Sequence, residues 1–463
     1  MWVSPVGKWI VLALLTIPCL AGCGRTRRVW RLESDLRETL APPWVRPVRV
    51  IEMDSGLGGQ WLAAGDLDGD GQVEFLAARN AKQAVTTLSA WKRDGSLLWV
   101  WGERGAGSPR LGYDVPVQIH DLDGDGANEV AFSIEGHLVF ADGATGREIR
   151  RTPLPDGLEV ADCIVFANLT GGERAADLII KDRYERIWAY DRDLRLLWSI
   201  EEPGGYRTAH HPEPIDLDGD GRDEVVVGYT AVDDDGTPLW TLEPSTIDIA
   251  RGHVDCCRVV RRGKRPKDFR LVFTCCSALG CILADGRGRV LREVAGWHFE
   301  SADVGDVRPD ARGPEIIVDV DHRPYGESQT WILSADGRRL CRLWSNYGRH
   351  HDLVDWNGDG VAEIVLGHAR ALCDGSGRRR ATFAPEGIGR ELAPPGDGDP
   401  EPFVFVGDVT GDGFEDVVLH TTERIEIYEN PSPHRSIEET HARDGKRKAT
   451  EARHGTGMNF TLY

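Results

Sequence analysis

A short acidic loop motif recurs along this chain and constrains its fold more than any other feature. In the best-preserved copy, IDLDGDGRDEVVVGY at Ile215–Tyr229, carboxylates occupy loop positions 1, 3, 5 and 9 and glycines lie between them. The glycines allow a tight turn, and clustered oxygen donors suit a hard cation such as Ca²⁺. An EF-hand would place its last acid at position 12 between helices, whereas the run Val225–Val227 after this loop predicts a strand. The motif therefore indicates a calcium site between two strands.

The motif repeats at a regular spacing. Its intact copies begin at Asp66, Asp121, Asp216, Asp355 and Asp408. Degenerate copies begin at Asn168 and Asp306, each with one extra residue before the closing acid. The gap between Asp216 and Asp306 is about twice the usual spacing of roughly 50 residues, so we expect a further unit near residues 255–258 whose loop is replaced by a basic turn. The sequence thus predicts eight units.

Each unit continues with short β-rich runs and a turn, then a strand that often ends in Leu-Trp, as at Trp99, Trp198 and Trp240. Four short strands per unit without helical periodicity predict an all-β, eight-bladed β-propeller, with seven blades as the alternative. We interpret the tryptophans as core between blades, and sugar-stacking platforms are the alternative. Because an open ring leaves unpaired edges, we expect residues 48–51, 424–428 and the strand-like terminus 459–463 to pair in one blade.

The N-terminal region predicts export. Residues 1–22 carry an apolar run too short to span a bilayer comfortably, which favours a cleaved signal peptide. Leu20-Ala21-Gly22-Cys23 resembles a bacterial lipobox, in which Cys23 becomes the lipidated first residue; an ordinary signal peptide and an uncleaved anchor are the alternatives. Gly24 favours the outer membrane of a Gram-negative host. We interpret residues 23–48 as a tether, 49–430 as the propeller and 431–463 as a polar tail with a terminal strand.

The amino-acid composition limits the kinds of binding partner that we expect. With 55 basic and 75 acidic residues the net charge is −20, which argues against nucleic acid and anionic membrane surfaces, although bound cations would neutralise many of the acids. We expect a monomer held at the membrane only through Cys23, with a polysaccharide or a surface protein as its partner.

Two cysteine doublets, Cys256-Cys257 and Cys275-Cys276, flank a basic turn and are expected on neighbouring strands of one hairpin. Because an exported protein folds in an oxidising compartment, cross-strand disulfides are the favoured interpretation. Buried free thiols and a soft-metal site are the alternatives, the latter weakened by the lack of a CxxC spacing.

Over about residues 50–430 the repeat resembles the FG-GAP or VCBS family of calcium-binding propellers. The resemblance implies that the innermost strand of each blade enters the loop and the next strand leaves it, so that each Ca²⁺ ties two strands together on one rim. The implied ligands are Asp66, Asp68, Asp70 and Glu74; Asp121, Asp123, Asp125 and Glu129; Asp216, Asp218, Asp220 and Glu224; Asp355, Asn357, Asp359 and Glu363; and Asp408, Thr410, Asp412 and Asp416. Gly172 and Arg308 replace ligands in the degenerate copies, which are therefore expected to bind no metal, the charge of Arg308 substituting for the ion.

Within this class the chain is similar to the eight-bladed propeller of the family 11 rhamnogalacturonan lyases, which are calcium-dependent and cleave a pectin backbone. The matching stretches are Gly252-His253-Val254-Asp255 and residues 305–318. The sequence departs from these enzymes between Cys23 and the first blade, where we expect no room for their N-terminal β-sandwich.

Histidines recur just before several units, at the expected start of the innermost strand and hence on the rim opposite the loops. The candidate catalytic residues are His211, His253, His298 and His351, and the candidate substrate contacts are Tyr206, Arg207, Tyr347 and Arg349. An arginine could bind the carboxylate of an acidic sugar while a histidine removes the adjacent proton in a β-elimination. Alternatively, the histidines cap the strand starts or bind a transition metal.

Two functions remain open at this point. The first is a lipid-anchored, calcium-binding propeller that acts as a cell-surface binding or scaffold module for carbohydrate or protein. The alternative is a calcium-dependent polysaccharide lyase that resembles rhamnogalacturonan lyase and acts on uronate-containing polysaccharide.

Overall fold

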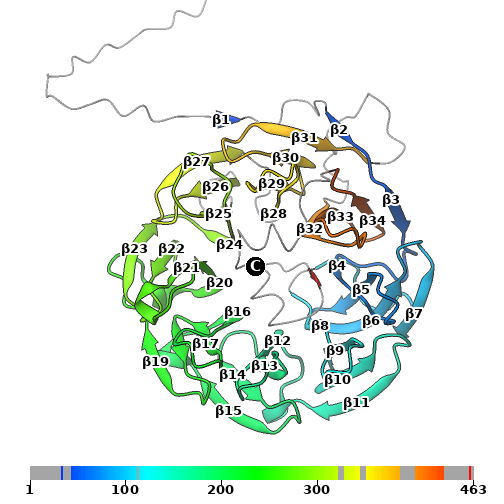
Figure 1. Ribbon diagram of the computed structural model, residues 1–463. Helices are drawn as coiled ribbons and strands as arrows, with labels where there is room; N and C mark the ends of the chain where they lie inside the picture. The colour runs from blue at the N-terminus through cyan, green and yellow to red at the C-terminus, as the bar shows by residue number, and fades with distance from the viewer. Residues whose placement is uncertain are drawn as a thin grey trace, which may run out of the picture. The chain divides into compact units, whose positions relative to one another are not determined.

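The computed structural model describes residues 33–34, 43–111, 114–321, 328–344, 351–385, 402–431 and 458–459. Within the unit Leu32–Tyr463, eight β-sheets surround a common axis as the blades of a propeller (Figure 1). The prediction of an eight-bladed β-propeller is therefore confirmed, and the seven-bladed alternative is excluded. The predicted signal peptide, Cys23 and most of the predicted tether and polar tail lie outside the described residues.

Each blade has four principal antiparallel strands, which follow one another from the axis outward. Blade 1 contains β4 (Trp61–Gly65), β5 (Glu74–Ala81), β6 (Ala84–Trp91) and β7 (Leu97–Gly102); blade 2 contains β8 (Val117–His120), β9 (Glu129–Ile134), β10 (His137–Asp142) and β11 (Glu148–Pro153); blade 3 contains β12 (Cys163–Ala167), β13 (Asp177–Lys181), β14 (Arg186–Tyr190) and β15 (Leu196–Glu201); blade 4 contains β16 (Thr208–Ile215), β17 (Glu224–Gly228), β18 (Thr230–Val232) and β19 (Pro238–Thr241).

The second half of the ring follows the same order. Blade 5 contains β20 (His253–Arg261), β21 (Arg270–Cys276), β22 (Gly280–Ala284) and β23 (Val290–Ala295); blade 6 contains β24 (Phe299–Gly305), β25 (Glu315–Val320), β26 (Gln329–Leu333) and β27 (Arg339–Trp344); blade 7 contains β28 (His351–Val354), β29 (Glu363–Leu366), β30 (Ala371–Cys373) and β31 (Arg379–Phe383); blade 8 contains β32 (Phe403–Gly407), β33 (Asp416–His420), β34 (Arg424–Tyr428) and β3 (Arg49–Glu52). The innermost strands face the axis in Figure 1.

Short additional elements complete the described fold. Strands β1 (Glu33–Ser34) and β2 (Trp44–Val45) add in parallel to the outer edges of β27 and β31, and β35 (Met458–Asn459) adds antiparallel to β4. The 3₁₀ turns are η1 (Pro155–Gly157), η2 (Pro203–Gly205), η3 (Ile249–Arg251) and η4 (Pro266–Asp268). Among the described residues, no helix has the length and hydropathy that a transmembrane span requires.

Strand β3 closes the ring. It pairs antiparallel with β34, from Arg49 opposite Ile427 to Glu52 opposite Arg424, so a segment that precedes blade 1 supplies the outermost strand of blade 8. This part of the closure prediction is confirmed. The placement of the C-terminal strand in the same blade was wrong, because β35 lies in blade 1, with Met458 opposite Ala64. The outer edge of β34 is already occupied by β3, whereas an innermost strand such as β4 still offers a free edge.

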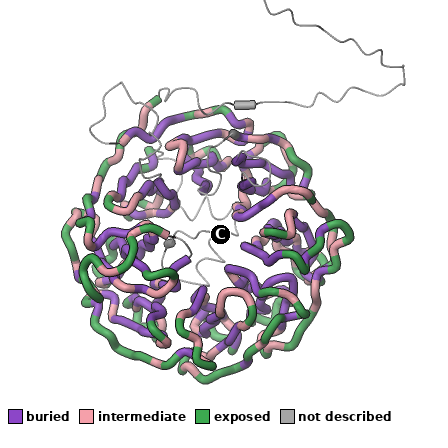
Figure 2. The backbone as a smooth tube through the Cα atoms, turned by 180° about the vertical axis from the view of Figure 1, so that it is seen from behind, coloured by how far each residue is buried: buried purple, intermediate pink, exposed green. Residues whose placement is uncertain are grey.

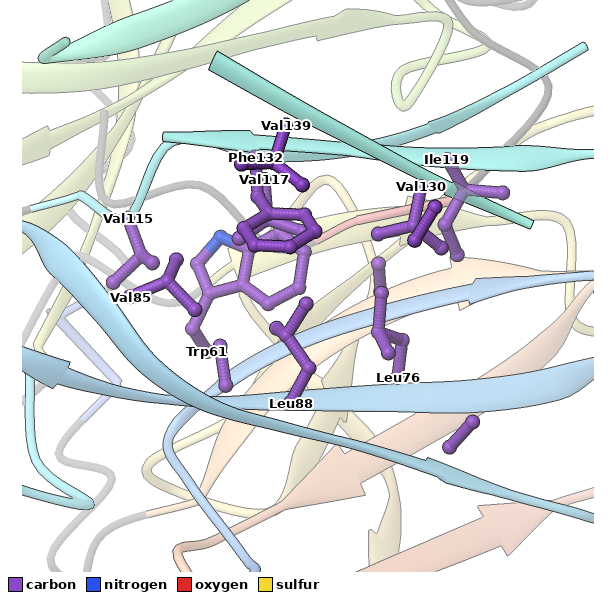
Figure 3. Close-up of a cluster of buried hydrophobic side chains, with 14 of the residues drawn as sticks. Trp61, Leu76, Val85, Leu88, Val115, Val117, Ile119, Val130, Phe132 and Val139 are labelled. Carbon is purple, nitrogen blue, oxygen red and sulfur yellow. The ribbon is translucent and has the colours of Figure 1, made fainter. Parts of the chain in front are cut away.

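The core lies between neighbouring blades, and exposed residues gather on the outer strands and loops (Figure 2). Figure 3 shows one such interface, in which Trp61, Leu76 and Leu88 of blade 1 pack against Val130 and Phe132 of blade 2. Because each blade buries one face against the next, no blade has a complete apolar core alone, and burial of these large side chains is the main force that holds the ring together.

The tryptophans at the third position of the outer strands β7, β15 and β19 join successive blades in a repeated way. The indole N–H donates to a backbone carbonyl in the turn of the next blade, from Trp99 to Gly143 (2.7 Å), from Trp198 to Asp234 (2.8 Å) and from Trp240 to Gly286 (3.0 Å). These contacts agree with the interpretation of the tryptophans as core between blades. The side chain of Trp344 lies outside the described residues.

Blade 5 is the unit without an acidic loop, and its strands β20 and β21 flank the basic turn as expected. The disulfide prediction was wrong, because Cys256, Cys257, Cys275 and Cys276 form no disulfide, and neither do the other cysteines that the structure describes. The antiparallel register sets Val254 opposite Cys275 and Cys257 opposite Phe273, so the doublets do not face each other as a bridge requires. The alternative of buried free thiols holds for Cys256, Cys257 and Cys275, while Cys276 is partly exposed.

Candidate functional site

The acidic loops lie between the first and second strands of their blades. In all seven loops the closing acid accepts the backbone N–H of loop position 2, in the pairs Glu74–Leu67, Glu129–Leu122, Asp177–Leu169, Glu224–Leu217, Glu315–Val307, Glu363–Trp356 and Asp416–Val409. Glycines at positive φ, such as Gly219 (86°) and Gly221 (90°), permit the turn. The closing acid therefore ties the loop to the second strand whether or not the loop keeps its other acids.

The intact loops fit a hard cation. Three of them bring carboxylate oxygens within 4.8 Å of one another, in the sets Asp66, Asp68 and Asp70; Asp121, Asp123 and Glu129; and Asp216, Asp218 and Glu224. Burial, reinforced by the neighbouring carboxylates, raises the pKa of Glu224 to about 8. In the fourth intact loop, Oδ1 of Asp355 is buried without a hydrogen-bond partner among the described residues. Oxygen donors gathered in this way are the ligands that Ca²⁺ prefers.

Side chains of the degenerate loops make contacts of their own, although Oε1 of the closing acid Glu315 in blade 6 is buried without a hydrogen-bond partner among the described residues. In blade 6, the guanidinium of Arg308 pairs with Asp310 at 2.7 Å, so a side-chain cation lies beside a carboxylate that would otherwise face an ion. In blade 3, the amide oxygen of Asn168 accepts the N–H of Gly172 at 2.6 Å, and its NH₂ group donates to Gly221 of the next loop at 2.7 Å. The expectation that these two loops hold no metal stays a prediction.

The predicted histidines lie at the starts of the innermost strands, at the opposite end from the loops, and each is close to a carboxylate. The distances are 2.8 Å for His211–Asp114, 3.4 Å for His210–Asp162, 3.1 Å for His253–Asp255, 3.2 Å for His298–Glu300 and 2.8 Å for His351–Asp303. Among the described residues, the candidate His253 lies against His210, which precedes the candidate His211 and was not itself a candidate, with their ring centroids 4.6 Å apart. The candidates His211, His298 and His351 have separate partners.

The pair His210 and His253 forms the centre of a buried polar group, which we call the His210–His253 cluster and which also contains Asp162, Lys181, Tyr184 and Asp255. Oδ1 of Asp255 lies 3.1 Å from Nε2 of His253 and 3.8 Å from Nε2 of His210. The ring of Tyr184 lies 4.8 Å from the ring of His253. Nδ1 of His253 is buried without a hydrogen-bond partner among the described residues. Nε2 of His253 therefore lies beside a carboxylate, whereas Nδ1 is enclosed and, in the part of the chain that the structure describes, has no such neighbour within hydrogen-bond geometry.

Burial sets the charge state of the cluster. It lowers the pKa of His210 to about 4 and that of His253 to about 3, so both imidazoles are neutral at pH 7. Burial opposes ionisation of Asp162, but Lys181, whose Nζ lies 2.8 Å away, and His210 together hold the pKa of Asp162 well below its usual value. The cluster therefore combines neutral bases with an ionised, paired carboxylate.

Two arginines lie over the aromatic ring at the edge of this cluster. The guanidinium carbons of Arg183 and Arg207 lie 5.1 Å and 5.2 Å from the centroid of Tyr184. Arg207 is exposed and Tyr184 is half-buried, so both are within reach of a ligand in solvent. Cations above an aromatic ring suit an acidic sugar, whose carboxylate pairs with arginine and whose apolar face stacks on the ring.

The remaining predicted substrate contacts are placed differently. Tyr206 packs against Tyr229 (5.8 Å between centroids) in the core of blade 4, which gives it a clear packing role. Tyr347, Arg349 and the neighbouring His350 lie outside the described residues.

The sequence analysis missed Asp162, Lys181 and Tyr184. Asp162 stands six positions before Asn168, the same offset as His210 before Asp216, so a search for any polar residue at this offset would have found it. Lys181 and Tyr184 lie at and just beyond the far end of β13. Only the strand order of blade 3 brings them beside the start of the innermost strand.

Two curated proteins are similar to this chain. The chain is 27% identical over 372 residues to the rhamnogalacturonan exolyase YesX of Bacillus subtilis (strain 168), an alignment that covers 65% of this chain and 59% of YesX. It is 24% identical over 275 residues to the endolyase YesW of the same organism, with 43% and 44% covered. The chain therefore spans about half the length of these curated relatives. A scan against protein-family models found no match, so the resemblance to the FG-GAP or VCBS repeat family remains a prediction.

Solved structures share the fold. The exotype lyase YesX superposes with a TM-score of 0.59 and 21% identity, covering 83% of this chain and 76% of that one. The Bacillus licheniformis rhamnogalacturonan lyase PL11 gives 0.58 and 19%, covering 90% and 81%. The V. cholerae biofilm matrix protein Bap1 gives 0.53 and 11%, covering 88% and 91%. At these identities the likeness concerns the propeller alone.

Proposed function

We propose that this protein is a polysaccharide lyase that cleaves a uronate-containing, rhamnogalacturonan-like polymer by β-elimination at the His210–His253 cluster. The observation that carries the proposal is the arrangement of His253, with Nε2 beside Asp255 and Nδ1 without a hydrogen-bond partner among the described residues, beneath Tyr184 and next to the exposed Arg207. The distant similarity to two rhamnogalacturonan lyases supports the same chemistry.

Each residue takes a defined role in this reaction. Arg207, with Arg183 beside it, binds the uronate carboxylate, and Tyr184 supports the sugar ring. Asp255, whose Oδ1 lies 3.1 Å from Nε2 of His253, keeps the ring proton on Nε2, and the Nδ1 lone pair removes the proton α to the carboxylate. The electron pair of the broken C–H bond forms a carbon–carbon double bond while the β carbon–oxygen bond breaks, and the leaving oxygen takes a proton from water. The arginines stabilise the negative charge that develops on the carboxylate.

The first test is product formation. The purified protein with Ca²⁺ is incubated with rhamnogalacturonan, polygalacturonate and a neutral polysaccharide, and the ultraviolet absorbance of unsaturated uronate is followed. We expect product from an acidic polymer and none from the neutral one. Absence of product from both acidic polymers, in the presence of Ca²⁺, would overturn the proposed lyase activity.

A noncatalytic binding module is the second candidate. It is favoured by the burial of His253, which is only 5% exposed, and by the low pKa of this side chain, about 3, which makes the imidazole a weak base. In this case the polymer would bind with a measurable Kd, Arg207→Ala would weaken binding, and no unsaturated product would form. Product formation rejects this candidate.

We further propose that the chain is exported and anchored to the cell envelope through lipid on Cys23, and that its intact loops bind Ca²⁺. The lipobox-like Leu20-Ala21-Gly22-Cys23 supports the first proposal, and the gathered loop oxygens support the second. Metabolic labelling with a radioactive fatty acid in a bacterial host tests the anchor. We expect label on the wild type and none on Cys23→Ala, whereas label on both variants would contradict it.

A further inference from the structure

Apart from the acidic loops, a group of side chains that can bind a metal ion lies at the neighbouring strand ends of blades 5 and 6. Cys276 ends β21, His298 immediately precedes β24, and Glu300 is the second residue of β24. Sγ of Cys276 lies 2.9 Å from Nε2 of His298, and Oε1 of Glu300 lies 3.2 Å from the same nitrogen. All three donor atoms lie within 4.8 Å of one another. They come from two blades, so the ring itself brings them together.

The donor set differs in kind from that of the acidic loops. The loops offer oxygen almost alone, as a hard cation requires. Cys276, His298 and Glu300 offer one sulfur, one nitrogen and one oxygen, the mixture that Zn²⁺ and neighbouring transition metals prefer. In a tetrahedral zinc site, ligand atoms about 2.0–2.3 Å from the metal lie roughly 3.5 Å apart. The observed separations of 2.9 Å and 3.2 Å need to open by roughly 0.3–0.6 Å to reach this value.

The surroundings of His298 resemble the second layer of a metal site. The carboxylate of Asp321 lies 3.8 Å from Nδ1, on the opposite side of the ring from Cys276 and Glu300. The backbone N–H of Asp321 donates to the carbonyl of His298 at 2.9 Å, which fixes the two residues in register. A carboxylate behind the imidazole orients the ring and raises its strength as a ligand. Glu300 and His298 are 1% and 5% exposed.

We propose that Cys276, His298 and Glu300 form a transition-metal site of the zinc type, distinct from the calcium loops. Cys276 is partly exposed while the other two ligands are buried, and a tetrahedral ion would take its fourth ligand from outside this set. The site does not depend on the proposed lyase activity, since neither His253 nor Arg207 belongs to it.

Co²⁺ serves as the spectroscopic probe of this site, because it can take the place of Zn²⁺ and gives an absorption band when a thiolate binds it. The full-length protein is reduced, stripped of metal with a chelator, desalted and titrated with Co²⁺ in excess Ca²⁺, which occupies oxygen-only sites. We expect one equivalent of Co²⁺ to produce a thiolate-to-cobalt charge-transfer band in the near ultraviolet, together with the strong visible absorption of four-coordinate cobalt. Added Zn²⁺ should displace it.

Single substitutions show which side chains give rise to the charge-transfer band. Cys276→Ser should abolish it, and Glu300→Gln should weaken cobalt binding at least tenfold. The matched control is Cys163→Ser, which removes a thiol that also lies against a histidine, with Sγ 3.6 Å from Nδ1 of His211; it should keep the band. His253→Ala should also keep it, which separates this site from the proposed lyase centre.

Two results would overturn the proposal. One is the absence of a charge-transfer band in wild-type protein that melts cooperatively, which would make the three residues a hydrogen-bonded group without metal. The other is a band of equal intensity in Cys276→Ser. Melting curves of each variant without cobalt show that any loss of the band reflects a lost ligand and not a lost fold.

Discussion

Burial controls the charge of single residues in this propeller, and His420 on β33 is a clear case. Its ring stacks on Phe403 (5.5 Å between centroids) and lies near Phe405 (6.0 Å). Burial lowers the pKa of His420 to about 3, against about 6.5 in an unfolded chain. The folded protein therefore keeps this imidazole neutral at pH values where the unfolded chain would protonate it.

A pH dependence of stability follows. Since the folded pKa is depressed, the contribution of His420 is fully present above pH 6.5 and is lost as the pH falls towards about 3, by up to about 1.4 kcal/mol per pH unit. Denaturant unfolding between pH 7 and 4.5 measures the slope. In His420→Phe the slope should be shallower by up to this amount, and an identical slope in both proteins would contradict the assignment.

The candidate site shows which properties of single residues can be predicted before the fold is known. The sequence placed His253 at a strand start because it stands just before an expected unit, and the structure makes it the first residue of β20, against His210. It could not reveal that Lys181, fully buried at the end of β13, would pair with Asp162, since that contact joins the end of one strand to the residue just before another. Nor could it fix the register that separates Cys257 from Cys275, because a shift of one residue reverses every side chain of a strand.

At the scale of the secondary-structure elements, the contact between a tryptophan of one blade and the turn of the next blade recurs around the ring. Where the indole of Trp198 covers the turn of blade 4, Gly236 has a φ of 84°, and a Cβ there would lie 2.7 Å from the ring. Gly146 and Gly288 have the same relation to Trp99 and Trp240. The DG turns seen in the sequence are therefore contact surfaces for the preceding blade as well as reversals of the chain.

Substitution of Gly236 tests this link. Gly236→Ala adds a clash with Trp198 to the strain of a positive φ, and we expect it to destabilise the protein by about 2–4 kcal/mol in denaturant unfolding. Gly95→Ala is the matched control, since Gly95 has a φ of 92° and a Cβ there meets nothing within 4 Å. It should cost about 1 kcal/mol, the backbone strain alone. Equal losses in the two variants would show that the tryptophan contact adds nothing.

At the scale of the whole molecule, the ring is stabilised by local contacts that repeat from blade to blade. Strand β3 closes it by pairing with β34, tryptophans join neighbouring blades, and the loops tie the two inner strands of most blades. Blade 5 has no acidic loop and yet forms four regular strands, so a blade can form without one. Because the motif repeats, the number of blades could be predicted from the sequence. The pairing of β35 with β4 could not, because it depends on which strand edge is still unpaired once the ring has formed.

Calcium should stabilise this ring in proportion to its intact loops. Without the ion their clustered carboxylates repel one another, so we expect a chelator to lower the Tm by several degrees or more, since binding to the folded state alone raises stability. Asp218→Asn should reduce the difference in Tm with and without Ca²⁺. Asp310→Asn in the degenerate loop should leave it unchanged, because Arg308 already pairs with Asp310. A melting curve that chelation does not move would contradict calcium binding.

The central claim is that loops on one rim stabilise the propeller while the His210–His253 cluster at the other end of the inner strands carries the chemistry. The most direct test is the rate of unsaturated uronate formation by wild type, His253→Ala and His137→Ala, the last a histidine on blade 2 outside the cluster. We predict a kcat at least 100-fold lower for His253→Ala, since a general base contributes about 10²–10⁴-fold, with KM and Tm little changed and His137→Ala equal to wild type. Equal rates in His253→Ala and wild type would contradict the claim.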